Sequence, residues 1–224
     1  MSELPRIHGI RAIVFDWNGT LKSMDEVLAQ DMELGRRHGH TPDPEAIRRA
    51  WGGGPVMQVV FGTDTVDLDW ARAEYDKLSP EFPKRLMPGV LSTIRTLRRT
   101  EPKLHLGIVT GGPRARLDLD MAQAGLPREY FDFTHSGAEI DADIAAGRPA
   151  FTKALGHLAA LGLARSQMLV VGDEPNNVRD AQEAGIPHVL ISSAGTMSRQ
   201  TLIERGVLPA IIIPTVAVLP EILQ

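Results

Sequence analysis

The sequence predicts an α/β fold in which helices surround a parallel sheet and a small helical segment is inserted after the first strand. From residue 88 onward, short apolar runs alternate with amphipathic segments, as in successive strand–helix units. Residues 22–87 show helical periodicity without two-residue alternation. The 224 residues, 43% of them hydrophobic, suit one α/β domain with a smaller insertion. We therefore expect a core domain of residues 1–21 and 88–224 and a helical cap domain of residues 22–87.

Each element is predicted from its apolar spacing and its turn residues. In the insert we expect helices over residues 24–38 and 70–78, a helix start at residues 41–44 and an interruption at the glycines of residues 52–54. The strands are expected at residues 12–15, 104–109, 130–135, 168–171, 189–191 and 211–213. The core helices are expected at residues 89–99, 113–124, 151–161 and 178–184, with a short terminal helix after the last strand. The acids Glu139, Asp141 and Asp143 are expected in an exposed loop.

Composition excludes several classes of function. The chain has no cysteine, which excludes disulfides, thiolate metal sites and a cysteine nucleophile. Its net charge of −4, without a basic run interleaved with aromatic residues, gives no indication of nucleic-acid binding. We expect no membrane span and no signal peptide, and therefore a cytoplasmic protein. The sequence leaves the oligomeric state open.

Polar residues follow three of the expected strands directly. Asp16 ends the first, Thr110-Gly111-Gly112 ends the second, and Gly172-Asp173-Glu174 ends the fourth. Because the carboxyl ends of parallel strands lie at one edge of the sheet, we expect these residues to converge there. Carboxylates are preferred ligands of Mg²⁺, and a hydroxyl with glycine-rich turn amides suits phosphate oxygens. The pattern therefore indicates a site for a phosphate with Mg²⁺.

An ordered set of motifs carries a family resemblance over nearly the whole chain. The segments are FDWNGTL, MPGVLSTIRTLRR, LGIVTGGPR, VVGDEPNNVRDAQEAG and, at the end, AVLPEIL. In this order they resemble the haloacid dehalogenase (HAD) superfamily, in particular its phosphoglycolate-phosphatase-like branch with a helical cap. The resemblance implies a Rossmann-like parallel-sheet core with an inserted small all-helical cap domain. It also implies Mg²⁺-dependent hydrolysis of a small phosphorylated substrate through an aspartyl-phosphate.

The resemblance assigns roles to individual positions. Asp16 is expected to be the nucleophile and, with the backbone carbonyl of Asn18 and the carboxylate of Asp173, to bind Mg²⁺. The residues expected to bind the phosphoryl group are Thr20, Thr110, Gly111, Gly112 and Arg148. Glu174 and Asn177 are expected to support the metal site from the second layer around it.

Three positions depart from the family pattern. Asn18 stands where a second aspartate usually acts as general acid and base, a role typically worth about 10²–10⁴ in rate. Arg148 stands where a lysine usually balances the charge of nucleophile and phosphate, and its planar guanidinium differs in geometry. Asn177 replaces a second acid of the last motif. We therefore expect weaker Mg²⁺ affinity and slower hydrolysis of the phosphoenzyme.

Other functions stay open at this point. The three departures also fit a protein that keeps the fold for binding or regulation and has lost efficient turnover. A metal-independent haloacid dehalogenase would use an aspartate nucleophile too, but it gains nothing from the acid at Asp173. A receiver domain shares the aspartate, threonine and lysine pattern, yet the helical insert and the chain length argue against it.

Overall fold

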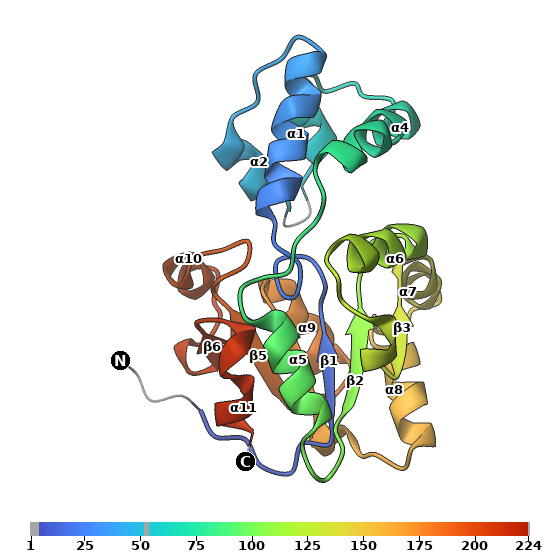
Figure 1. Cartoon of the computed structure of the whole chain (residues 1–224), viewed down its shortest axis with the longest axis vertical. Coiled ribbons are helices and arrows are strands. Elements are labelled where there is room, and N and C mark those ends of the chain that lie inside the picture. The colour runs from blue at the N-terminus through green and yellow to red at the C-terminus, as the bar shows by residue number, and fades with distance from the viewer. Residues whose placement is uncertain (1–4, 52–53, 224) are drawn as a thin grey trace. The chain divides into compact units, whose positions relative to one another are not determined.

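The computed structural model describes residues 5–51 and 54–223, which divide into two compact units (Figure 1). The core unit comprises Met1–Lys22 and Leu86–Gln224, and the cap unit is Ser23–Arg85. The cap unit thus begins one residue later and ends two residues earlier than the sequence-based division at residues 22–87. Of the expected interruption at residues 52–54, residues 52–53 lie outside the described part of the chain.

The core unit contains a sheet of six parallel strands, which confirms the predicted fold class. The order is β3-β2-β1-β4-β5-β6, so β1 lies between β2 and β4 (Figure 1). The strands are β1 (Ala12–Phe15), β2 (His105–Val109), β3 (Phe133–His135), β4 (Met168–Gly172), β5 (His188–Ser192) and β6 (Ile212–Ile213). The strand order reverses direction at β1, and in open α/β sheets such a point marks the binding crevice at the carboxyl ends.

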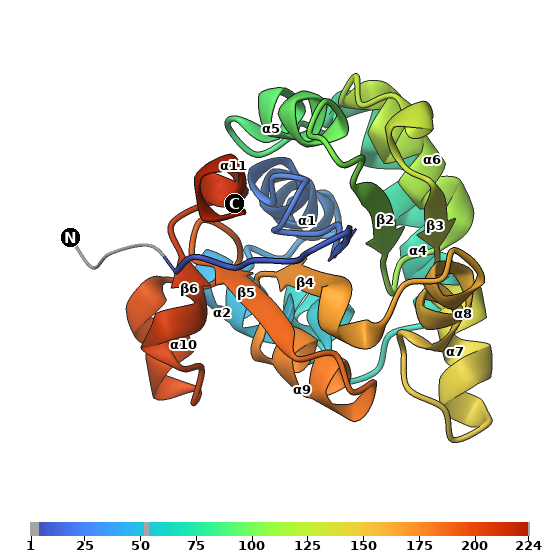
Figure 2. The same ribbon diagram turned by 90° about the horizontal axis from the view of Figure 1, so that it is seen from below.

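Helices cover both faces of the sheet (Figures 1 and 2). Ile13 and Phe15 of β1 pack with helices α5, α6 and α11, whereas Ala12 and Val14 pack with α7, α8, α9 and α10. Alternate residues of β1 therefore enter opposite apolar layers, as the pleat of a strand requires. The helices are α5 (Val90–Arg98), α6 (Arg114–Gln123), α7 (Gly137–Ala145), α8 (Thr152–Ala160), α9 (Pro175–Glu183), α10 (Arg199–Glu204) and α11 (Leu219–Ile222).

The described part of the cap unit is helical and has an apolar centre of its own. Its buried residues Leu34, Ile47, Val60 and Leu78 come from four different helices. These helices are α1 (Asp25–Arg37), α2 (Pro44–Trp51), α3 (Val56–Phe61) and α4 (Leu68–Leu78). Short 3-10 turns complete the chain: η1 (Ser79–Glu81), η2 (Arg128–Tyr130), η3 (Arg165–Gln167), η4 (Pro209–Ile211) and η5 (Val216–Val218). None of the helices in the described ranges is long and apolar enough to cross a lipid bilayer.

The expectation of an exposed loop at residues 139–143 is wrong. These residues lie in α7, and Asp143 is buried. Ser136 and Glu139 form a reciprocal capping box at the start of the helix, which satisfies backbone N–H groups that a helix start leaves unpaired. Helix α10 was not expected from the sequence; it begins at a cap where the Ser198 side chain accepts from the Thr201 N–H. The expected strand at residues 130–135 is shorter, because its first residue belongs to η2.

Candidate active site

The central strand and its two neighbours deliver the expected residues to one edge of the sheet. Asp16, Thr110 and Asp173 follow the parallel strands β1, β2 and β4, respectively. The Asp16 N–H donates to the Val171 carbonyl at 2.9 Å, so the β1–β4 ladder extends to the residue before the polar loop. Asp16 and Asp173 lie close enough for the charge of Asp173 to raise the pKa of Asp16. The structure therefore joins two acids that lie far apart in the sequence.

Hydroxyl and backbone N–H donors hold the carboxylate of Asp173 in place. Its carboxylate is fully buried, and the Thr20 hydroxyl donates to Oδ1 at 3.2 Å. Oδ2 accepts the Thr196 N–H at 2.8 Å and the Thr196 hydroxyl at 2.7 Å. Thr20 and Thr196 come from the loops after β1 and β5, so one carboxylate connects both segments. In this structure Thr20 contacts the proposed metal acid, and its expected role toward phosphate stays a prediction.

Two glycines allow the loops to approach this carboxylate. Gly19 has φ +71°, and a Cβ at this position would lie 2.1 Å from Asp173 Oδ2. At Gly195 a Cβ would lie 2.3 Å from the Gly19 carbonyl oxygen and 2.5 Å from the same carboxylate oxygen. Real Cβ atoms do not approach so closely, and the left-handed backbone at Gly19 disfavours other residues as well. The packing of the loops after β1 and β5 therefore requires glycine at both positions.

The electrostatics of the site favour a positively charged occupant. Burial raises the pKa of Asp16 well above its usual range, and the charge of Asp173 raises it further. Burial also raises the pKa of Asp173, although the donors Thr196 and Thr20 oppose the effect. The pKa of Glu174 rises to about 7, first because of burial and then because of Asp173. Three neighbouring carboxyl groups thus resist simultaneous ionisation unless a cation accompanies them.

The donor chemistry fits a hard divalent cation. Asp16 and Asp173 present carboxylate oxygens at adjacent strand ends, and burial together with the charge of Asp173 raises the pKa of Asp16. A bound cation would offset this repulsion between the two carboxylates, and Mg²⁺ takes few protein ligands while keeping several waters. The described residues contain no group of three histidine, aspartate or glutamate side chains placed to hold a metal ion. Two carboxylates and the backbone carbonyl of Asn18 are the set that the sequence predicts.

The turn after β2, at which the sequence predicts phosphate binding, is compact. Thr110 is buried, and its hydroxyl accepts the Gly112 N–H at 3.3 Å. The Gly112 carbonyl accepts the Gly137 N–H at 2.8 Å, and a Cβ on Gly137 would lie 2.4 Å from the Gly111 carbonyl oxygen. The turn therefore packs directly against the start of α7. Gly111 is exposed, so its backbone lies at the surface where a ligand can approach.

Arg148 and Asn177, two of the three residues that depart from the family pattern, each form hydrogen bonds with other residues of the core unit. Arg148 pairs with Asp143 of α7, with its Nε and Nη2 at 2.9 and 2.6 Å from Oδ1. Asn177 lies in the first turn of α9, where its Oδ1 accepts the N–H groups of Asp173 and Glu174 at 3.2 and 3.0 Å. A Cβ on Gly172 would lie 2.1 Å from this same Oδ1. Asn177 thus fixes the backbone that carries Asp173, whereas Arg148 is engaged with a carboxylate outside the Asp16–Asp173 pair.

Sequence reasoning missed four residues that shape this region. Thr196 and Gly195 gave no local signal, because their role depends on a loop that approaches Asp173 from β5. Lys22 and Asp120 form a buried ion pair of 2.7 Å, and Asp120 also accepts the Trp17 Nε1–H at 3.4 Å. Asp120 could have been found, since it shares the buried face of α6 with Leu117 and Met121. A charge on such a face predicts a buried partner.

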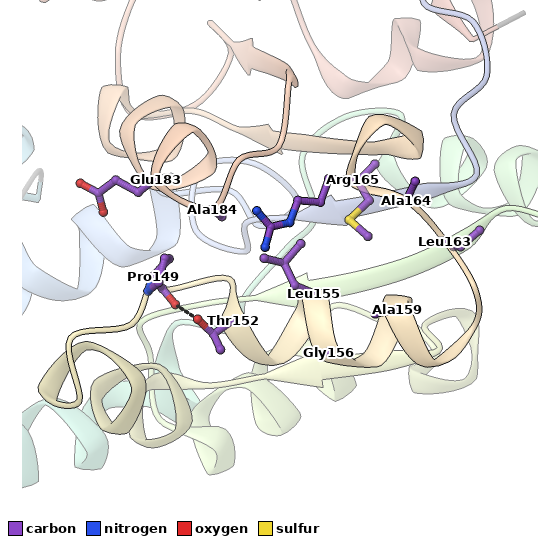
Figure 3. A pocket seen from close by; sticks show the side chains of 11 residues that line it. Pro149, Thr152, Leu155, Gly156, Ala159, Leu163, Ala164, Arg165, Glu183 and Ala184 are labelled. Carbon is purple, nitrogen blue, oxygen red and sulfur yellow. Dashed lines mark hydrogen bonds between the residues drawn. The ribbon is translucent and has the colours of Figure 1, made fainter.

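A groove elsewhere in the core unit contains none of the expected site residues (Figure 3). It has a volume of about 480 Å³ and is bordered by α8, the start of β4 and the end of α9. Pro149 lines it, and the Thr152 hydroxyl donates to the Pro149 carbonyl at 2.7 Å. The start of β4 belongs to the edge of the sheet opposite Asp173. The groove is therefore separate from the strand ends that carry the acids.

The fold agrees with comparisons to known proteins. The chain belongs to the family of haloacid dehalogenase-like hydrolases, whose model matches residues 13–191. Among curated proteins it is similar to the phosphoglycolate phosphatase of Yersinia pseudotuberculosis, with 26% identity over 198 residues that cover 81% of either chain. It is 28% identical over 199 residues to the phosphoglycolate phosphatase of Photorhabdus laumondii, covering 82% of this chain and 80% of the relative.

Solved structures with the same fold extend over almost the whole chain. A predicted phosphoglycolate phosphatase from Haemophilus somnus superposes with a TM-score of 0.76 and 19% identity, covering 96% of this chain and 98% of that one. A conserved haloacid dehalogenase-like protein of unknown function from Agrobacterium tumefaciens gives a TM-score of 0.71 and 20% identity, with 96% and 97% covered. At these identities the structures support the fold, including the helical insertion.

Proposed function

We propose that the protein hydrolyses a small phosphate ester, with Mg²⁺ as cofactor and Asp16 as the nucleophile. The observation that carries this proposal is the placement of Asp16 and the buried Asp173 directly after the adjacent parallel strands β1 and β4, where the charge of Asp173 raises the pKa of Asp16. Such a pair is costly for stability because both carboxyl groups resist ionisation, so it indicates a site built for a cation. The phosphoglycolate phosphatase relatives support a phosphate ester as the substrate class.

The chemistry proceeds in two displacements. A carboxylate oxygen of Asp16 attacks phosphorus, the bond to the ester oxygen breaks, and an aspartyl-phosphate forms. The departing alkoxide takes a proton from solvent. Water then attacks the phosphoenzyme, which releases inorganic phosphate and restores Asp16. Thr110 and the amides of Gly111 and Gly112 hold the phosphoryl oxygens where negative charge develops.

The remaining site residues support this reaction without forming bonds to phosphorus. Asp16, the Asn18 carbonyl and Asp173 would hold Mg²⁺, which supplies charge neutralisation when it is bound. Glu174 lies beside Asp173, and Asn177 fixes the backbone of both residues. Arg148 stays in the proposed site as a cation for the phosphate. Because Asp143 already balances its charge, we expect its contribution to be small.

Asn18 limits the rate in this proposal. Its amide cannot donate or accept the protons that an aspartate carries between leaving group, water and solvent. We therefore expect the second displacement to be slow and the phosphoenzyme to accumulate. Replacing Asn18→Asp should raise steady-state turnover of p-nitrophenyl phosphate by about 10²–10⁴, the usual contribution of general acid–base catalysis. The exposed Gln182→Glu variant adds the same charge on α9 and should leave turnover unchanged.

Trapping with beryllium fluoride and Mg²⁺ tests the nucleophile. We expect one acyl-phosphate mimic per chain on Asp16, detected by ¹⁹F NMR, and none in Asp16→Asn. The matched control Asp118→Asn alters an exposed aspartate of α6 and should bind the probe normally. Trapping that survives Asp16→Asn, or brisk turnover after Mg²⁺ is removed with EDTA, would contradict the proposal.

A second candidate function is a binding or regulatory protein with little turnover. The observation that favours it is the engagement of Arg148 by Asp143 and of Asn177 by the backbone, which removes both from direct work on substrate. It predicts that Mg²⁺ with beryllium fluoride raises the melting temperature while p-nitrophenyl phosphate is not hydrolysed, even by Asn18→Asp. Recovery of turnover in Asn18→Asp decides for the phosphatase.

The cap unit and the cellular location belong to the same proposal. We assign substrate selection to the helical insert, because the residues at the strand ends account for the phosphate and the metal alone. A cytoplasmic location is supported by the absence of cysteine from the sequence.

A further inference from the structure

The loop that carries the nucleophile is closed on itself and then fastened to a neighbouring helix. Leu21 and Lys22 donate their N–H groups to the Trp17 carbonyl at 3.1 and 2.9 Å, and the Gly19 N–H donates to the Lys22 carbonyl at 2.9 Å. These bonds make residues 17–22 a compact ring directly after Asp16. Trp17 and Lys22 stand at its two ends. Their side chains both reach Asp120.

A single carboxylate oxygen of Asp120 accepts both hydrogen bonds. The Lys22 Nζ lies 2.7 Å from Oδ2, and the Trp17 Nε1 donates to the same atom at 3.4 Å. The three side chains are buried, and the exposed fraction of the Asp120 side chain is 0%. Within the described residues, the second oxygen of Asp120 has no hydrogen-bond partner although it is buried. The carboxylate is thus only partly satisfied.

Stability alone does not explain this arrangement. The desolvation of a buried ion pair often costs as much free energy as the attraction between the two charges contributes. Well-packed apolar residues can therefore replace such a pair without a loss of stability. Asp120 belongs to α6, which begins four residues after Thr110 on the segment that leaves β2. Asp120 therefore connects the loop of the nucleophile to the helix that follows the phosphate-binding turn.

We propose that Asp120, Lys22 and Trp17 form a positioning clamp that holds Asp16 and Thr110 in the relative placement needed to face one phosphoryl group. The clamp rests on the proposed function, because it acts through Asp16. Lys22 lies close enough to Asp16 for their charges to interact, which adds attraction to the ionised nucleophile. Asp120 and Trp17 are positioning residues and touch no reacting atom.

The test replaces the whole clamp charge pair with apolar side chains of similar size. Lys22→Met/Asp120→Leu should melt within about 3 °C of the wild type, since the apolar pair packs in the same place. The first turnover of p-nitrophenyl phosphate, followed as the burst of p-nitrophenol at saturating substrate with Mg²⁺, should slow by about 10²-fold, the cost of a displacement near 1 Å. The half-saturating substrate concentration should change less than about threefold, because the groups that bind phosphate are kept.

A matched control uses another ion pair of the core unit. Arg98 and Asp132 lie 2.9 Å apart, near the amino end of β2, and Asp132 also accepts the Leu106 N–H. Arg98→Met/Asp132→Asn keeps that acceptor while it removes the charges, and its burst rate should equal that of the wild type. Equal slowing of this variant would show a general loss of stability and would overturn the clamp.

Each remaining outcome also supports or overturns the proposed clamp. A burst rate in Lys22→Met/Asp120→Leu equal to the wild type overturns the clamp and leaves the phosphatase proposal intact. Wild-type protein without any burst or trapped phosphoryl mimic removes both proposals together. Should the double variant fail to fold, Trp17→Phe removes one donor and keeps the aromatic packing. A burst several-fold slower at unchanged melting temperature then supports the clamp, and an unchanged burst overturns it.

Discussion

Two aspartate–cation pairs in the core unit differ in how they treat the cation. Lys22, in the loop that follows Asp16, is buried against Asp120, whereas Arg148 is half exposed and reaches back to Asp143 within its own loop and helix. Arg148 occupies the position at which the family resemblance places the charge-balancing lysine, whereas Lys22 belongs to the loop that directly follows Asp16 and lies close enough for their charges to interact. A cation such as Arg148 can therefore keep its expected place in the sequence while a local carboxylate, here Asp143, balances its charge.

The largest expected difference between the two pairs is in folding stability. Asp120→Ala leaves the buried Lys22 ammonium without its partner and should lower the free energy of unfolding by about 3–5 kcal/mol. Asp143→Ala leaves an Arg148 side chain that is 50% exposed and hydrated by solvent, so we expect a loss of about 0–1 kcal/mol. Urea denaturation of both variants measures the difference. Similar losses in the two variants would contradict the contrast in burial.

The parts of the fold that depend on local pattern could be predicted from the sequence. The apolar runs identified all six strands, and the polar residues after them placed Asp16 and Asp173 at one edge. Alternation along the chain is a local property, so it is visible without the fold. The capping pair Ser136 and Glu139 is a local signal as well, but α7 carries only two large apolar side chains, Ile140 and Ile144, among its three acids, so the stretch also fits an exposed loop.

The contacts that shape the site could be predicted only in part. Lys22 and Asp120 are 98 positions apart, and Thr196 lies 23 residues after Asp173. Their pairing follows from the order of the strands and from the approach of loops, which no local pattern records. The buried face of α6 signals that Asp120 needs a partner. This pattern does not identify Lys22 as the partner, because a lysine after an apolar loop is equally compatible with solvent exposure.

A kinetic comparison sharpens the different roles of the two cations. Arg148→Met should raise the half-saturating concentration of p-nitrophenyl phosphate by no more than about fivefold, because a half-exposed charge contributes about 0–1 kcal/mol. Its burst rate should stay within about twofold of the wild type, since Asp16 and Thr110 keep their places. Burst kinetics at several substrate concentrations measure both quantities. A burst slowed as strongly as in Lys22→Met/Asp120→Leu would return to Arg148 the role that the family resemblance implies.

The smallest expected difference is the response of the two pairs to salt. The coupling free energy within each pair follows from a double-mutant cycle, measured by urea denaturation at 0.05 and 0.5 M sodium chloride. The half-exposed pair of Arg148 and Asp143 should lose a few tenths of a kcal/mol at the higher concentration, because ions screen exposed charges over a few ångströms. Lys22 and Asp120 exclude solvent, so their coupling should be unchanged within error. The exposed pair of Arg114 and Asp118 is a reference for full screening. Equal salt sensitivity in all three pairs would mean that water reaches Lys22, and the clamp could not then be rigid.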